Sequence, residues 1–286
     1  MNGGPAGIKP RWLKRNAEKW LEQPGPPFLP WKPVKANFLT ESSFMENMIE
    51  VIRKDLRASA NEKDRLSSER FFREEIKLYG MKSKEITRIS REYSEKVKKL
   101  SKEEIFTLCG ELWRSGYFEE AIVACEWAYQ RRKSFVPADF EILERWVHHH
   151  VSNWAVCDTL CNHTVGEFII MYPVFVDKLK GWALSDNRWV RRASAVSLII
   201  PARKGMFGKE IFEIAGILLT DSDDMVQKGY GWMLKVFSQY GPIQQKAVFD
   251  YVMDHKKVMP RTALRYAIEK MDPEMRKKAM EKGRGD

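Results

Sequence analysis

Apolar residues recur every three or four positions along most of this chain, and that spacing restricts the possible folds more than any other feature. Phe44, Met48, Ile52 and Leu56 follow one another at four-residue steps. This period places side chains on one face of an α-helix, and no segment shows the alternation of a convincing strand. We therefore expect an all-α chain of about a dozen helices joined by short loops.

An internal repeat of 36 residues refines this fold prediction. Val190 and Val226 are 36 residues apart, each shortly after a Leu-Ser/Thr-Asp turn, and a further step back reaches Trp154. A helical pair can bury its apolar face only against neighbouring pairs, so the pattern predicts a HEAT-like helical-repeat solenoid with a concave basic groove. This register makes three sets of positions equivalent: Asp158, Ser194 and Tyr230; Val156, Arg192 and Lys228; and Leu160, Val196 and Trp232.

Positive charge is concentrated in particular parts of the sequence. The formal net charge is +10. Residues 178–209 contain eight Lys or Arg against one acidic residue, Asp186. Such a cluster attracts polyanions, most often DNA or RNA, although a basic run can also be only a solvated face.

Composition also suggests how the chain is divided. We expect residues 1–40 to form a Pro-rich basic N-terminal arm, residues 41–282 to form the folded domain, and residues 283–286 to form a short tail. No apolar run approaches the roughly 20 residues that span a bilayer, and the start lacks the apolar core of a secretory signal. Four cysteines in so long a chain do not suggest a disulfide framework. We expect a cytoplasmic monomer without membrane contact, associated with the nucleoid if the source is prokaryotic.

Several His and Cys residues invite a metal interpretation, which we reject. Consecutive histidines at 148–150 cannot all point one way on a helix, and the spacing of Cys157 and Cys161 is not that of a usual structural zinc site. No Gly-rich phosphate loop is present. We expect neither a metal nor another cofactor.

Three motifs carry a resemblance to a known family. They are Asn153–Asp158, which contains Trp-x-x-x-Asp, then Asp186–Ala193 and Val226–Trp232. In this order and spacing they resemble the AlkD-type DNA alkylation repair glycosylases, with a likeness over about residues 42–275. The resemblance implies hydrolysis of the N-glycosidic bond of cationic N3- or N7-alkylated purines in duplex DNA. It also implies that an abasic site remains and that no deep pocket captures the base, unlike most glycosylases.

The resemblance assigns roles to particular residues. It implies a catalytic set of Asp158, Trp154 and Trp232, with Arg192 as a phosphate ligand and Phe71 as the aromatic on an early helix. Arg188, Lys228 and Lys235 are further phosphate candidates. A cationic base leaves without protonation, so one carboxylate, Asp158, can stabilise the positive charge that develops on the sugar and orient water.

Each assignment has a plainer alternative. Asp158 can be a helix cap or a surface charge, and Arg192 can pair with a carboxylate between repeats such as Asp186. Most of the ten tryptophans must be packing residues, and we place four of them in the core: Trp113, Trp127, Trp146 and Trp182. The competing function is a non-catalytic HEAT-like protein that binds damaged or branched DNA, and a protein-protein adapter is a third.

Overall fold

A computed structural model describes residues 38–281 of the chain, with side chains from Phe44 onward. The predicted arm therefore lies outside the described residues, apart from Phe38, Leu39 and Thr40 at the start of helix α2, and so does the predicted tail at 283–286. The described residues divide into two compact units, here called the N-terminal unit (residues 38–172) and the C-terminal unit (residues 173–281).

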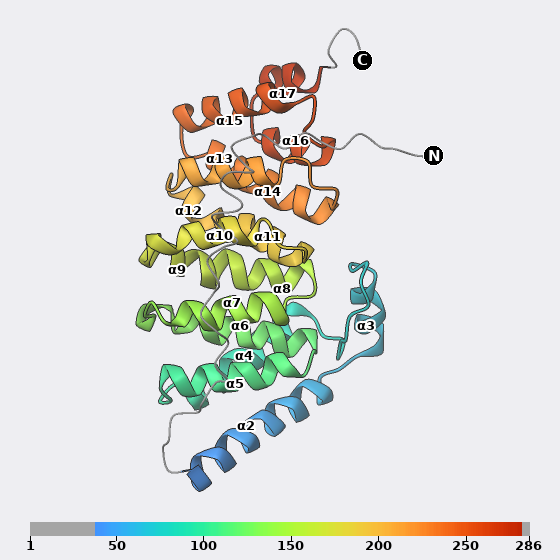
Figure 1. Cartoon of the computed structure of the whole chain (residues 1–286). Helices are drawn as coiled ribbons and strands as arrows, with labels where there is room; N and C mark the ends of the chain where they lie inside the picture. The colour runs from blue at the N-terminus through green and yellow to red at the C-terminus, as the bar shows by residue number, and fades with distance from the viewer. Residues whose placement is uncertain (1–37, 282–286) are drawn as a thin grey trace, which may run out of the picture. The chain divides into compact units, whose positions relative to one another are not determined.

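The N-terminal unit is built of α-helices that pack side by side, apart from α3, which lies to one side of the others (Figure 1). They are α2 (Phe38–Ala58), α3 (Glu62–Glu69), α4 (Ser83–Val97), α5 (Lys102–Arg114), α6 (Phe118–Gln130) and α7 (Asp139–His149), with a short 3₁₀ turn at Arg132–Ser134. A last helix runs from Trp154 to Met171 in three parts: α8 (Trp154–Asp158), a π-helical segment (Thr159–Val165) and α9 (Gly166–Met171).

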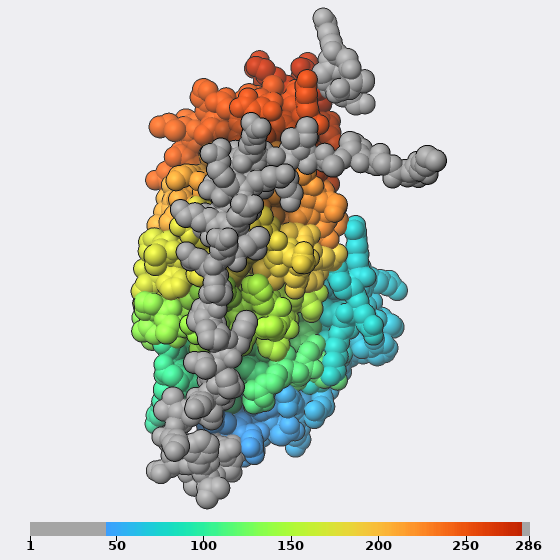
Figure 2. Space-filling view, viewed as in Figure 1, coloured from blue at the N-terminus to red at the C-terminus, as the bar shows by residue number. Residues whose placement is uncertain are grey.

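The C-terminal unit continues the same pattern. After a 3₁₀ turn at Pro173–Phe175 it contains α10 (Val176–Trp182), α11 (Arg188–Val196), α12 (Ile199–Arg203), α13 (Gly208–Ile217), α14 (Asp224–Ser238), α15 (Pro242–His255), α16 (Arg261–Ile268) and α17 (Pro273–Met280). In the C-terminal unit, the colours of the space-filling view run from yellow through orange to red in chain order (Figure 2). Packing between sequence neighbours is characteristic of a helical repeat.

The all-α helical-repeat prediction is confirmed. Across residues 38–281 the nearest approach to sheet structure is an isolated bridge between Lys77 and Tyr117. In the same residues, no helix is both long enough and apolar enough to cross a bilayer. All four tryptophans assigned to the core are buried: Trp113, Trp127, Trp146 and Trp182.

The 36-residue register was wrong by two residues at its first step. Asn153, Asn187 and Asp223 cap α8, α11 and α14, each accepting a backbone N–H of the first turn. These caps are 34 and then 36 residues apart. Asp158, Arg192 and Lys228 are therefore equivalent, because each is the fifth residue after its cap.

Small residues let neighbouring helices of the C-terminal unit approach closely. Gly231 on α14 faces α16, where an added Cβ would lie 2.7 Å from Tyr266 Cβ and 2.8 Å from the carbonyl oxygen of Ala263. Gly231 therefore allows close backbone contact between these two helices. It also fixes α14 and α16 at a separation that no larger residue at position 231 would permit.

Candidate functional site

Helix α8 presents Trp154 and Asp158 on one face. The buried side chain of Asn153 begins the helix by accepting the backbone N–H of Val156 at 3.0 Å. Trp154 and Asp158 are both half-buried, whereas Val156 and Cys157 between them are buried. Residues four apart are neighbours on a helix surface, so the indole and the carboxylate share an accessible face.

A π-helical segment follows Asp158 directly. It covers Thr159–Val165 and separates α8 from α9. Thr159 Oγ1 donates to the Ala155 carbonyl at 2.8 Å, just before this segment. π-helical turns are rare and frequent at functional sites, and sequence reasoning missed this one. Its effect is to change the side-chain register after Asp158 without disturbing the turn that pairs Asp158 with Trp154.

The segment between α3 and α4 holds the Trp154 indole in place. Trp154 Nε1 donates to the carbonyl oxygen of Phe71 at 3.4 Å. The ring of Phe72 stacks on Trp154 with centroids 5.8 Å apart, and its other neighbour is Phe118 at 5.6 Å. Phe71 as a residue is 72% exposed. Phe71 therefore touches Trp154 through its backbone, and the aromatic support comes from Phe72, which the sequence analysis did not select.

Two buried carboxylates anchor that segment. Glu119 accepts the backbone N–H groups of Tyr79 at 3.0 Å and Gly80 at 2.8 Å. Glu120 accepts the Tyr79 hydroxyl at 2.6 Å and pairs with Arg53 at 3.2 Å. Glutamates in the first turn of a helix such as α6 also complement the helix dipole. In the sequence, these two residues therefore look like an ordinary helix start, and their role as anchors is not visible.

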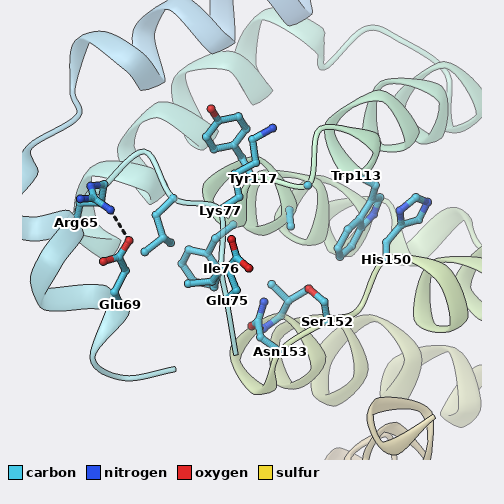
Figure 3. Close-up of a pocket in the computed structure, with 15 residues that line it drawn as sticks. Arg65, Glu69, Glu75, Ile76, Lys77, Trp113, Tyr117, His150, Ser152 and Asn153 are labelled. Atoms are coloured by element: carbon cyan, nitrogen blue, oxygen red, sulfur yellow. Dashed lines mark hydrogen bonds and ion pairs between the residues drawn. The ribbon is translucent and has the colours of Figure 1, made fainter. Parts of the chain in front are cut away.

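A pocket of about 560 Å³ lies in the N-terminal unit beside the start of α8 (Figure 3). Asn153 and Val156 contribute to its lining, whereas Trp154 and Asp158 do not. Figure 3 shows Trp113 and His150 on one side of it. Partial burial lowers the pKa of His150, and the neighbouring charges of His149 and Arg114 lower it further. In residues 38–281, no three His, Cys, Asp or Glu side chains are grouped to hold a metal.

In the C-terminal unit, Arg192 is buried on α11. Its Nη1 donates to the carbonyl oxygen of Met225 in the first turn of α14. Gly229 makes room for it, since an added Cβ there would lie 3.2 Å from Arg192 Cγ. The guanidinium is therefore positioned by the backbone of the next repeat.

The other basic candidates of this unit take part in ion pairs. Arg188 contacts Asp223 at 3.0 Å, Lys228 contacts Asp224 at 3.1 Å, and Lys235 contacts Glu269 at 2.8 Å. Arg191, which sequence reasoning did not select, bonds Asp221 of the next repeat at 2.7 Å and the carbonyl of Asp186 at 2.9 Å. Much of the basic cluster at 178–209 thus connects repeats to one another.

Trp232 is half-buried on α14. Lys228, Trp232 and Lys235 are spaced four and three residues apart, so an indole lies between two cations along one helix face. The N-terminal unit thus holds Trp154 and Asp158 on one helix, with the backbone of Phe71 against Trp154. The C-terminal unit holds its basic candidates and Trp232 on two adjoining helices, α11 and α14: Arg188, Arg192, Lys228, Trp232 and Lys235. The concave basic groove stays a prediction.

These features define an all-α helical-repeat protein with a Trp-x-x-x-Asp helix and arginine- and lysine-bearing repeat helices. The chain matches the model of the DNA alkylation repair enzyme family over residues 52–271, and it belongs to that family. Membership implies that DNA is its partner.

A solved structure from Enterococcus faecalis, described as a predicted DNA alkylation repair enzyme, has a similar fold. Its TM-score is 0.65 at 16% sequence identity, over 75% of this chain and 98% of the other. No curated protein matches the chain significantly.

Proposed function

We propose that this protein is a monofunctional DNA glycosylase that hydrolyses the N-glycosidic bond of cationic N3- or N7-alkylated purines in duplex DNA. The observation that carries the proposal is the accessible Trp154–Asp158 face in a chain of the DNA alkylation repair enzyme family. The product is an abasic site, and the base is not captured in a deep pocket. The pocket beside α8 fits this proposal, since neither Trp154 nor Asp158 lines it.

Asp158 acts on the sugar rather than on the base. An alkylpurine cation already carries the charge that makes it a good leaving group, so no general acid is needed. As the glycosidic bond stretches, positive charge develops on the deoxyribose, and a nearby carboxylate stabilises it. The same carboxylate can orient or deprotonate the attacking water.

The two indoles and Arg192 supply binding. Trp154 and Trp232 offer electron-rich faces, which favour a cationic nucleoside by about 0.5–2 kcal/mol per contact. Trp154 is suited to this because Phe72 and the Phe71 carbonyl fix its orientation. Arg192 binds a phosphate without reading sequence, as do Arg188, Lys228 and Lys235 more weakly, and Phe71 offers an exposed ring to DNA.

The test is release of 7-methylguanine from methylated duplex DNA under single-turnover conditions. Asp158→Asn should slow release by about 100-fold or more, the scale of an acid-base or electrostatic catalytic group. It should also bind unmodified duplex at least as tightly as the wild type. Asp186→Asn is the matched control, because it makes the same chemical change on an exposed residue of a neighbouring motif.

Equal rates for wild type and Asp158→Asn would remove Asp158 from the mechanism. Because water rather than an amine is the proposed nucleophile, borohydride should trap no covalent adduct, and a trapped adduct would contradict the monofunctional assignment. Tight, salt-sensitive DNA binding by the wild type without release of any alkylated base would instead support the non-catalytic binding protein.

A further inference from the structure

The N-cap positions show that one repeat position carries a charged residue in each of four helices, α8, α11, α14 and α16. Counting five residues from Asn153, Asn187 and Asp223 gives Asp158, Arg192 and Lys228. Pro260 is the cap residue of α16, and the fifth residue after it is Arg265. Within the C-terminal unit, this fifth position is therefore basic on α11, α14 and α16.

These three helices are packed against one another. α14 contacts both α11 and α16, and the three lie in succession in Figure 1. Both contacts are close because of glycine: Gly229 on α14 meets the Arg192 side chain, and Gly231 on α14 meets the backbone of Ala263. Equivalent positions on packed, equivalent repeat helices form a row, which we call the fifth-position row: Arg192, Lys228 and Arg265.

Arg265 is the most accessible member of this row. Arg192 is buried and Lys228 half-buried, whereas Arg265 is exposed. The side chain of Arg265 has no hydrogen-bond or ion-pair partner among residues 44–281. The carboxylate one turn further along α16, Glu269, is bonded to Lys235 at 2.8 Å and to Lys270 at 3.3 Å.

The other basic side chain of α16 has a structural task. Arg261, the first residue of the helix, donates to the Met280 carbonyl at 3.2 Å and so ties α16 to the end of α17. In α11, the first residue Arg188 likewise bonds Asp223 of the next repeat. First-position cations thus connect elements of the fold, and Arg265 at the fifth position has no such contact.

We propose that Arg265 is a further phosphate ligand, and that one DNA strand runs along the fifth-position row from Arg192 past Lys228 to Arg265. A planar guanidinium on an exposed helix surface can bind a phosphate in a bidentate fork. The contact would be independent of sequence and of damage, because phosphates carry no base information. It rests on the proposed function only for the phosphate roles of Arg192 and Lys228.

The experiment measures the affinity of the full chain for an unmodified fluorescent duplex between 50 and 200 mM salt. Each phosphate contact adds about 0.9 to the slope of log affinity against log salt. Arg265→Ala should lower the slope by about that amount. Over this fourfold salt range, the affinity loss of the variant should be about 3.5-fold smaller than that of the wild type.

Two further variants make the result decisive. Arg265→Lys keeps the charge and should keep the slope. Arg276→Ala removes an exposed arginine of the same unit that is outside the row, at the fourth position after the cap of α17, and should also leave the slope unchanged. An unchanged slope for Arg265→Ala, or an equal loss for Arg276→Ala, would overturn the proposal. Unmodified DNA is used, so failure of base release would not affect this measurement.

Discussion

Replacing Gly231 with alanine tests whether close packing of α14 on α16 supports the C-terminal unit. The new Cβ would lie 2.7 Å from Tyr266 Cβ and 2.8 Å from the Ala263 carbonyl oxygen, distances that force backbone to move. Overpacking of this kind costs about 1–3 kcal/mol, and rigid backbone atoms favour the upper end. The higher helix propensity of alanine relative to glycine offsets up to about 1 kcal/mol of this loss. The expected net loss is about 2 kcal/mol, or about 4–8 °C in melting temperature.

Gly110→Ala is the matched control for that measurement. Gly110 is also inside a helix, but the nearest atom to its added Cβ is Arg114 Nη2 at 3.8 Å, the end of a flexible side chain. The control should therefore gain up to about 1 kcal/mol from helix propensity alone. Thermal unfolding by circular dichroism provides both values. The packing argument fails if Gly231→Ala melts at or above the wild-type temperature.

Two further expectations concern the N-terminal unit. Phe72→Ala should slow base release more than Phe71→Ala in the assay above, because only Phe72 stacks on Trp154; a greater effect of Phe71→Ala would show that the exposed ring contributes more than the support. In the folded protein, the pKa of His150 lies below its ordinary value, whereas the unfolded chain takes up a proton on this residue near pH 6.5. The free energy of unfolding therefore falls as the pH drops below about 6.5. The melting temperature of His150→Gln should therefore change less between pH 7.5 and 5.5 than that of the wild type, and an identical change would show that this titration does not matter.

Helix periodicity was sufficient to predict the fold class, because the spacing of apolar residues along the sequence defines the apolar face of each helix. Positions such as Ile52 and Leu56 are buried as the four-residue spacing predicts. The repeat length was harder to predict from the sequence. A two-residue difference between loops shifts the register without altering the apolar pattern inside each helix. The caps Asn153, Asn187 and Asp223 carried the correct register, since these residue types mark the first turn of a helix.

The surroundings of Trp154 were less accessible to sequence reasoning. Phe71 and Phe72 are adjacent, and outside a helix adjacent side chains point in different directions, so a shift of one residue decides which ring meets the indole. The choice depends on how Glu119 holds the backbone at Tyr79, a contact between residues 40 apart. The π-helical segment likewise has no simple sequence signature. Long-range contacts such as that between Glu119 and Tyr79 cannot be predicted from local sequence patterns.

The cap register also bears on the chemistry. The fifth position after the cap holds a carboxylate, Asp158, in α8 and a cation in α11, α14 and α16, namely Arg192, Lys228 and Arg265. Under the proposed function Asp158 lies next to DNA, where a carboxylate opposes binding of the phosphates and so weakens affinity for intact duplex. That cost is offset where positive charge develops on a sugar, which occurs only as the bond to a cationic base breaks. An asparagine at position 158 should therefore bind intact DNA no less tightly while losing catalysis, a combination that general damage to the fold would not produce.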